Sequence, residues 1–199
     1  MLAEKLPLPT DITEAEYLAG EPLATVRHEY VDGKVYAMAG TSRRHHRIAL
    51  NLVRRLPLET PDGKPCAIHA SDVKVRADKS KAYYYPDVVV GCEADDTNPY
   101  YLEKPCLIAE ITSKSSEWKD YFEKALAYQK IPSLQAYWII SPDQPQVVVF
   151  YRDTENDWEV TRYADLEQTV PLPCLEAPLT LADIYAGVDF SQPIDEVTP

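Results

Sequence analysis

The sequence predicts an α/β fold in which helices flank a mixed central β-sheet. Short apolar runs of strand length alternate with longer segments whose apolar residues recur at helical spacing. Residues 106–141 form a strand, helix, strand unit, and such units join parallel strands through a right-handed crossover. The 199 residues suffice for one complete core. We therefore expect a single domain over residues 1–199, with its core at about residues 10–185 and an acidic C-terminal tail.

A short helix and a β-hairpin are predicted first. Thr13-Glu14-Ala15-Glu16 has the pattern of a capping box, and Gly20 and Pro22 end the helix that it opens. Residues 27–39 alternate around Asp32-Gly33, a dipeptide typical of the two-residue turn of a hairpin.

Two longer helices are predicted at residues 42–56 and 115–130. Ser42 is the expected N-cap of the first helix, and Ser115 or Ser116 that of the second. The residues of the second helix that we expect to face the core are Trp118, Tyr121, Phe122, Ala125 and Tyr128.

The remaining elements are mostly strands. Residues 67–77 and 81–91 are predicted to pair, and a polar connection follows at residues 93–105. Residues 106–112 are apolar except for Glu110, which is typical of a central strand. Further strands are predicted at residues 137–141, 147–151 and 158–163, and a last short helix at residues 179–185.

The net charge of −12 opposes a nucleic-acid partner, because Lys and Arg that neutralise phosphates supply most non-specific binding. The charge is unevenly spread, however. Acidic residues gather toward the tail, while Arg43, Arg44 and Arg47 crowd one early helix. These three arginines are expected either to contact phosphates or to form a solvated helix face.

No stretch approaches the roughly 20 apolar residues that a membrane helix needs, and the N-terminus has no signal-peptide pattern. We expect no membrane partner and a cytoplasmic location. The four cysteines, Cys66, Cys92, Cys106 and Cys174, are irregularly spaced and include no C-x-x-C. This spacing argues against a zinc site and predicts free thiols, with Cys92 and Cys106 in the core.

Two carboxylates lie in strand candidates that we expect to pair with each other, residues 81–91 and 106–112. Asp87 follows Pro86, and Glu110 lies within the apolar run 106–112. A divalent cation needs hard oxygen ligands from more than one segment, and Asp87, Glu110 and the carbonyl of Ile111 could supply three. The alternatives are that Asp87 only ends a strand or caps a turn, and that Glu110 pairs with an internal Lys or Arg, since a desolvated carboxylate needs a partner.

Lys124 is predicted at the rim of the apolar stripe of the second long helix, from which its ammonium could reach the strand ends. There it could stabilise the negative charge that develops on a phosphodiester under attack. The alternative is a solvated lysine paired with Asp120 at i−4.

The order of these motifs resembles the Uma2 family, which is placed in the PD-(D/E)XK nuclease superfamily. The resemblance covers residues 10–185, and where the superfamily signature has its lysine this chain has Thr112. The segments that carry it are Pro86-Asp87, Glu110-Ile111-Thr112-Ser113, Asp120-Tyr121-Phe122-Glu123-Lys124, Tyr128, Tyr137-Trp138-Ile139-Ile140, residues 27–40 and His45.

The resemblance implies a restriction-endonuclease-like core and a Mg²⁺- or Mn²⁺-dependent endonuclease that hydrolyses nucleic acid, with DNA favoured over RNA. It implies that Asp87, Glu110, Lys124 and His45 are catalytic, with Glu29 and Tyr128 as secondary candidates. His45 could instead be a helix-end residue and Glu29 a salt-bridge partner. The alternative function is a non-catalytic nuclease-like scaffold that binds a protein partner or nucleic acid, and a homodimer is a further expectation.

Overall fold

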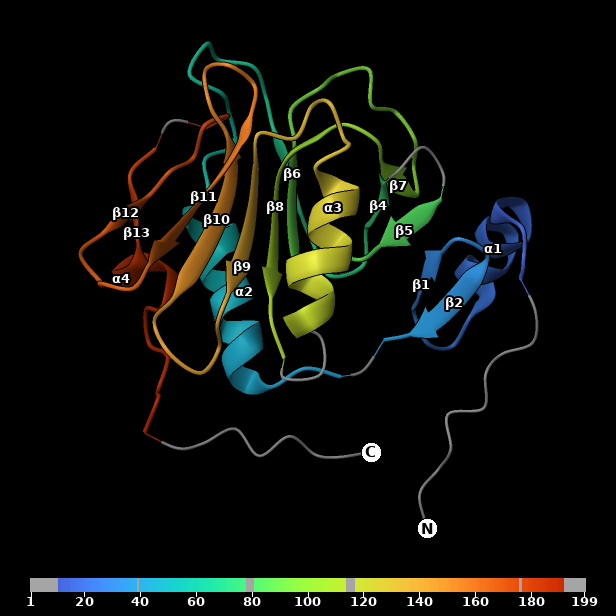
Figure 1. Cartoon of the computed structure of the whole chain (residues 1–199), viewed down its shortest axis with the longest axis horizontal. Coiled ribbons are helices and arrows are strands. Elements are labelled where there is room, and N and C mark those ends of the chain that lie inside the picture. The colour runs from blue at the N-terminus through green and yellow to red at the C-terminus, as the bar shows by residue number, and fades with distance from the viewer. Residues whose placement is uncertain (1–10, 39, 78–80, 114–116, 176, 192–199) are drawn as a thin grey trace.

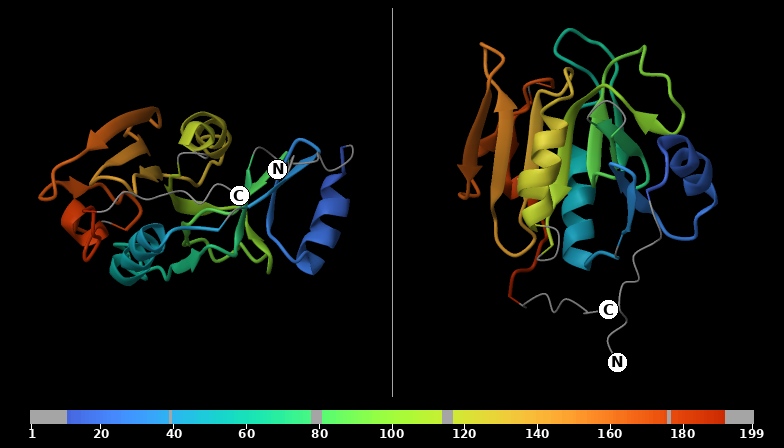
Figure 2. Two further views of the ribbon diagram at one scale, coloured as in Figure 1. Left: turned by 90° about the horizontal axis from the view of Figure 1, so that it is seen from below. Right: turned by 45° about the vertical axis from the view of Figure 1, so that its right-hand side comes forward.

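A central β-sheet lies between helices in the computed structural model, which describes residues 11–38, 40–77, 81–113, 117–175 and 177–191 (Figures 1 and 2). In the described part of the chain this sheet has six strands in the order β11-β10-β9-β8-β6-β3. Strands β8 and β9 are parallel, and the other neighbours are antiparallel. The mixed sheet and its crossover are as predicted. The strands are β3 (Ala67–Ala70), β6 (Val88–Gly91), β8 (Pro105–Ile111), β9 (Ala136–Ile140), β10 (Val147–Arg152) and β11 (Trp158–Tyr163).

A second sheet has the order β2-β1-β5-β4-β7 and carries the predicted hairpin. Asp32 and Gly33 form the turn with φ values of 47° and 90°, as a two-residue turn of this kind requires. Thr13 caps the helix α1 through the predicted capping box. The elements are α1 (Glu14–Gly20), the 3₁₀ helix η1 (Glu21–Leu23), β1 (His28–Val31), β2 (Lys34–Ala37), β4 (Lys74–Ala77), β5 (Ala82–Tyr84) and β7 (Tyr101–Leu102).

The predicted strands 67–77 and 81–91 do pair, but each is broken into two. Their first and last parts, β3 and β6, join the central sheet, whereas β4 and β5 join the second sheet. Ser71 lies at one break, and its φ of 63° departs from the extended backbone of a strand. Pro86 lies at the other break and has no backbone N–H to donate to a neighbouring strand. The connection predicted at 93–105 contains the short strand β7, which pairs in parallel with β4.

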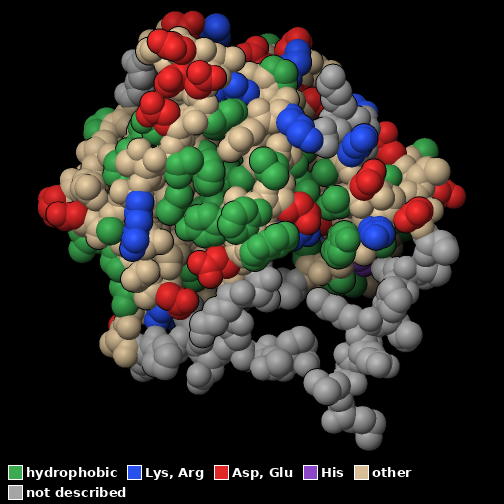
Figure 3. Space-filling view, viewed as in Figure 1, with side chains coloured by type: hydrophobic (Ala, Val, Ile, Leu, Met, Phe, Trp, Pro, Cys, Tyr) green, Lys and Arg blue, Asp and Glu red, His purple; other side chains and the backbone are tan. Residues whose placement is uncertain are grey.

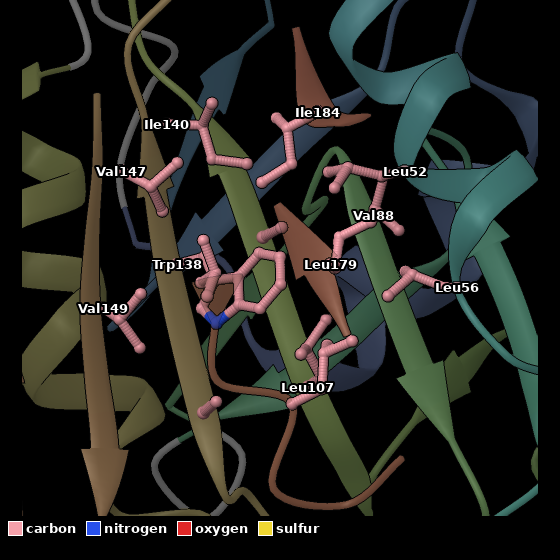
Figure 4. Packing of buried hydrophobic residues seen from close by; sticks show 14 of the residues in the cluster. Leu52, Leu56, Val88, Leu107, Trp138, Ile140, Val147, Val149, Leu179 and Ile184 are labelled. Atoms are coloured by element: carbon pink, nitrogen blue, oxygen red, sulfur yellow. The ribbon is translucent and has the colours of Figure 1, made fainter. Parts of the chain in front are cut away.

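Helix α2 (Arg43–Arg55) covers one face of the central sheet and begins at the predicted N-cap Ser42. Its apolar side belongs to one buried hydrophobic cluster with Val88, Leu107 and Trp138 of the sheet (Figure 4). The C-terminal part adds to this layer through β12 (Thr169–Val170), β13 (Leu179–Thr180) and α4 (Leu181–Ile184).

The opposite face is covered by a π-helix, η3 (Lys119–Lys124), which continues into α3 (Ala125–Tyr128). Ser115 and Ser116, the predicted N-caps, lie outside the described residues. Ala125 and Tyr128 face the core as predicted.

The prediction was wrong for Trp118 and Phe122, which are 69% and 57% exposed. Trp118, Phe122 and Leu126 recur every four residues on a second apolar stripe that faces solvent, so apolar residues mark two sides of this helix and only one of them packs on the sheet. The positions turned inward are Asp120 and Lys124 instead.

The cysteines are paired, and the prediction of free thiols was wrong. Disulfides join Cys66 to Cys92 and Cys106 to Cys174. The register that pairs Ala67 with Gly91 places Cys66 opposite Cys92, one residue further along. The two cysteines are therefore neighbours in space although 26 residues separate them in the sequence. Cys106 is buried as expected, whereas Cys92 is only half-buried. Among the described residues, no helix has the length and apolar character needed to cross a membrane.

Candidate active site

Strands β6 and β8 bring Asp87 and Glu110 to the same end of the central sheet. Their antiparallel register pairs Val88 with Ala109, so Asp87, just before β6, lies beside Glu110, the residue after Ala109 in β8. The backbone N–H of Ile111 donates to Asp87 Oδ2 at 2.7 Å. Asp87 is therefore held against the strand that carries Glu110, as the sequence predicted.

His45 reaches the same carboxylate from the first turn of α2. The Ser42 side chain accepts from the backbone N–H of His45, which fixes this turn. Nε2 of His45 lies 3.1 Å from Asp87 Oδ2, within reach of a hydrogen bond. His45 thus contacts a candidate metal ligand, and the N-cap that positions it was recognisable in the sequence.

Lys124 lies in the interior among three carboxylates. Its Nζ is 3.0 Å from Glu110 Oε1, 3.0 Å from Glu29 Oε1 and 3.2 Å from Asp120 Oδ1. The predicted i−4 pair with Asp120 exists, but both side chains are buried, so the alternative of a solvated surface lysine is wrong.

Tyrosines also contact these buried charged groups. Tyr128 donates its O–H to Glu110 Oε1 at 3.0 Å, which places this secondary candidate on the same oxygen that Lys124 contacts. The O–H of Tyr137 donates to the backbone carbonyl of Asp120 at 2.9 Å and fixes the turn of η3.

Lys119 is a member of the site that sequence reasoning missed. Its Nζ lies 2.5 Å from Glu29 Oε2, so Glu29 joins Lys119 to Lys124. Residues 119 and 124 are five apart, a spacing that puts side chains on different sides of an α-helix but on one side of a π-helix. No α-helical pattern in the sequence could have indicated this pair.

The site holds more negative than positive charge. Among the described residues, four carboxylates interact electrostatically with Lys124 or with one another: Glu29, Asp87, Glu110 and Asp120. Two lysines oppose them, Lys124 and Lys119, the second through its ion pair with Glu29. The excess is concentrated at Glu110, because Asp120, Asp87 and Glu29 all oppose its ionisation.

The pKa values follow from this imbalance. Burial raises the pKa of Glu110 well above its usual value, and Lys124 offsets the shift only in part. Burial lowers the pKa of Lys124, but Glu110, Glu29 and Asp120 outweigh it and raise that pKa, so the ammonium stays charged. Burial likewise raises the pKa of Glu29, but Lys124 and Lys119 outweigh it and bring the pKa below 4.5.

The donor set fits a divalent cation at Asp87 and Glu110. Both are hard carboxylate ligands, and the raised pKa of Glu110 marks a place where added positive charge would be stabilising. In the described part of the chain, no three His, Cys, Asp or Glu side chains converge as a ready ligand set. Mg²⁺ does not need three protein ligands, because it commonly takes one or two carboxylates and completes its coordination shell with water and phosphate oxygens. The Ile111 carbonyl as a third ligand stays a prediction.

The three arginines of α2 have different surroundings. Arg43 and Arg47 are exposed, near the end of the helix that presents His45. Arg44 is half-buried: its guanidinium donates to the carbonyl of Pro142 at 3.1 Å and lies 5.3 Å from the ring centroid of Phe190. These contacts tie the Arg44 side chain into the fold.

The fold is that of a restriction-endonuclease-like α/β domain. It superposes on the crystal structure of a protein from Anabaena variabilis ATCC 29413, described as "a putative nuclease belonging to DUF820", with a TM-score of 0.68. The match covers 87% of this chain and 97% of the other at 19% sequence identity, so it shows a shared fold.

Sequence comparison gives the family. The model of the Uma2 family, described as "Putative restriction endonuclease", matches residues 15–182, and the chain belongs to this family. Two proteins of Synechocystis sp. (strain ATCC 27184 / PCC 6803 / Kazusa) are similar along most of their length. The protein slr1290 is 31% identical over 90% of this chain and 94% of its own, and sll1609 is 35% identical over 75% and 86%.

Proposed function

We propose that this protein is a Mg²⁺- or Mn²⁺-dependent endonuclease that hydrolyses phosphodiester bonds of nucleic acid, DNA in preference to RNA, in the cytoplasm. The observation that carries the proposal is the buried ammonium of Lys124, which three carboxylates hold beside the end of β8. A lysine in these surroundings stays protonated and fixed in place, as a group that stabilises a developing negative charge must be.

Asp87 and Glu110 would hold the ion, which when bound supplies a Lewis acid and a water of lowered pKa. The chain's own residues position these ligands. His45 and the N–H of Ile111 orient Asp87, and Tyr128 and Lys124 orient Glu110. Lys124 then stabilises the charge on the phosphate under attack.

The exposed Arg43 and Arg47 lie on the helix that carries His45 and would contact phosphates on either side of the cleaved bond. They answer the objection raised by the net charge of −12, because the charge near the site and not the total decides where a backbone binds.

The proposal is tested by incubating the purified full chain with plasmid, single-stranded DNA and RNA in Mg²⁺, Mn²⁺, Ca²⁺ or EDTA. We expect cleavage in Mg²⁺ or Mn²⁺ that Asp87→Asn abolishes. The matched control is Asp95→Asn, which alters an exposed carboxylate that pairs with Lys104. Cleavage by Asp87→Asn at the parent rate would refute the assignment of Asp87.

A non-catalytic scaffold is the second candidate, and Thr112 at the superfamily's lysine position favours it. Lys124 weakens this objection, because its ammonium reaches Glu110 from the neighbouring helix. The two candidates differ in one measurable property, since a scaffold has no need of a divalent ion at Asp87 and Glu110.

We also propose that two copies associate through the face shown in Figure 3, where hydrophobic side chains gather over α3 and the strands beside it. Trp118, Phe122, Leu126 and Val160 are large and exposed. Glu117 and Arg162 both lie near Tyr121 on this face, since the charge of each acts on that tyrosine. A two-fold axis through the face would therefore let Glu117 of one copy pair with Arg162 of the other.

Phe122→Asp should shift a dimer toward monomer in sedimentation velocity, whereas Leu23→Asp, at an exposed leucine of η1, should not. A monomeric parent would exclude the dimer.

A further inference from the structure

Tyr36 is an aromatic side chain that faces the charged cluster and has no role in the mechanism described above. Strand β2, which carries it, is an edge strand of the second sheet in the described part of the chain. The register of the hairpin pairs Tyr36 with Glu29, so the two side chains lie on the same face of this sheet. Val35 points to the other face, where it packs with Tyr17 and Tyr30.

Lys119 links Tyr36 to the proposed active site. Its ammonium lies over the ring of Tyr36, with Nζ 4.8 Å from the ring centroid, within the range of a cation–π interaction. The same Nζ lies 2.5 Å from Glu29 Oε2, and Glu29 also contacts Lys124. Glu29 thus fixes Lys119, and Lys119 in turn fixes the orientation of the ring.

Exposure to solvent increases along this series of contacts. The side chain of Lys124 is 7% exposed and that of Lys119 is 23% exposed, whereas Tyr36 is 46% exposed as a residue. A ligand that approaches the site from β2 therefore meets the ring of Tyr36 first, then Lys119, and the buried ammonium of Lys124 last.

The ring and the ammonium are suited to the two parts of a nucleotide. An aromatic side chain stacks on a base whatever its identity, and an ammonium contacts a phosphate. In a continuous duplex the neighbouring base pairs cover both faces of each base, so only an unpaired base offers a face to such a ring. Tyrosine is common in strands for its propensity alone, but propensity does not account for the ammonium that lies over this one.

We propose that Tyr36 stacks on an unpaired base of the substrate while Lys119 contacts a phosphate beside that base, so that the site binds single-stranded nucleic acid in preference to duplex. This preference rests on the proposed nuclease function and names the form of nucleic acid that the site takes. The exposed Arg43 and Arg47 do not oppose it, because arginines contact the phosphates of either form.

The test compares the affinity of the full chain for single-stranded DNA and for the same sequence as duplex, by fluorescence anisotropy in Ca²⁺, which takes oxygen ligands as Mg²⁺ does. We expect tighter binding of the single strand. Tyr36→Leu should weaken that binding about 10-fold and leave duplex binding unchanged, because the lost contact is a base stacked on an aromatic ring. Tyr36→Phe keeps the ring and should retain parent affinity. Tyr100→Leu, at another exposed tyrosine, is the matched control.

A set of single strands that each lack the base at one position separates stacking from a structural effect. Removal of the stacked base should weaken binding by the parent about 10-fold but leave binding by Tyr36→Leu unchanged, since both changes remove the same contact. If no position shows this coupling, the proposal is overturned. Equal affinity of the parent and Tyr36→Leu for the single strand, or a parent that binds duplex at least as tightly, overturns it as well.

Cleavage is measured separately in Mg²⁺ or Mn²⁺, so the two proposals can fail independently. Coupled binding of the base and Tyr36 without any cleavage would refute the nuclease function and leave the role of Tyr36 in binding. Cleavage by the parent, with no effect of Tyr36→Leu on binding, would refute the role of Tyr36 alone.

Discussion

The two faces of the central sheet are built from the same strands and both bury apolar side chains, but the face beneath η3 and α3 also buries charged ones. In β8, Leu107, Ala109 and Ile111 point into the apolar layer beneath α2, whereas Ile108 belongs to the layer beneath α3 and Glu110 contacts Lys124. Alternation along β8 thus gives Leu107, Ala109 and Ile111 to one face, and Ile108 and Glu110 to the other. The apolar face beneath α2 supplies stability, whereas the face beneath η3 and α3 combines apolar packing with buried charges, whose desolvation lowers the stability of the fold.

The largest loss of stability is expected from the apolar face. Leu107→Ala removes a fully buried side chain from the core of Figure 4 and should lower the free energy of unfolding by about 3 kcal/mol. Urea unfolding measures this loss, and Leu23→Ala, at an exposed site, is the control. If the two faces act independently, folded Leu107→Ala should bind Mn²⁺ with the same affinity as the parent. Weakened ion binding would show that the two faces are not independent.

Lys124→Met should also destabilise the fold, because it leaves Glu29, Glu110 and Asp120 without their shared cation. We expect a loss of about 2–3 kcal/mol, less than the upper range for broken buried pairs since Glu110 can take up a proton. Unlike Leu107→Ala, it should abolish cleavage completely. Lys64→Met, at a lysine whose side chain is 64% exposed, is the control in both assays. Undiminished cleavage by Lys124→Met would remove this residue from the mechanism.

Glu29→Gln should have a smaller effect that depends on pH. The pKa of Glu29 is lower in the folded protein than its ordinary value of 4.5. The ionised group therefore stabilises the fold in full above about pH 4.5, and this contribution is lost as the pH falls through the folded pKa. Parent and variant should differ by about 1–2 kcal/mol at pH 7 and converge in acid, as urea unfolding between pH 7 and 3 would show. Glu155→Gln is an exposed control, and a difference that does not change with pH would contradict the ion pairs of Glu29.

The sequence was sufficient for most of the elements and for predicting which candidate residues lie near one another. Alternation, caps and the Asp32-Gly33 turn predicted the hairpin and α2, because these signals are local. The pairing of 81–91 with 106–112 brought Asp87 to Glu110 as expected.

The errors arose where helical spacing was ambiguous or where the structure depends on distant contacts. Apolar residues lie on two sides of the helix that carries Lys124, and helical spacing alone does not say that the side with Trp118 and Phe122 faces solvent while Asp120 and Lys124 face the sheet. The cysteine pairs depend on register between strands far apart in the sequence, and spacing along the chain does not contain that information.

The central claim is that the charged face exists to bind a divalent cation, and calorimetric titration of Mn²⁺ into the parent and Glu110→Gln tests it most directly. Gln keeps the shape of Glu110 and can still accept from Lys124 and Tyr128, but it removes the carboxylate whose pKa burial and its acidic neighbours raise. We predict that the ion-free variant is within about 1 kcal/mol of the parent in stability at pH 7, or more stable, and that it loses Mn²⁺ binding while Asp95→Asn retains it. Equal Mn²⁺ affinity in the parent and Glu110→Gln, or no binding by the parent, would contradict the account.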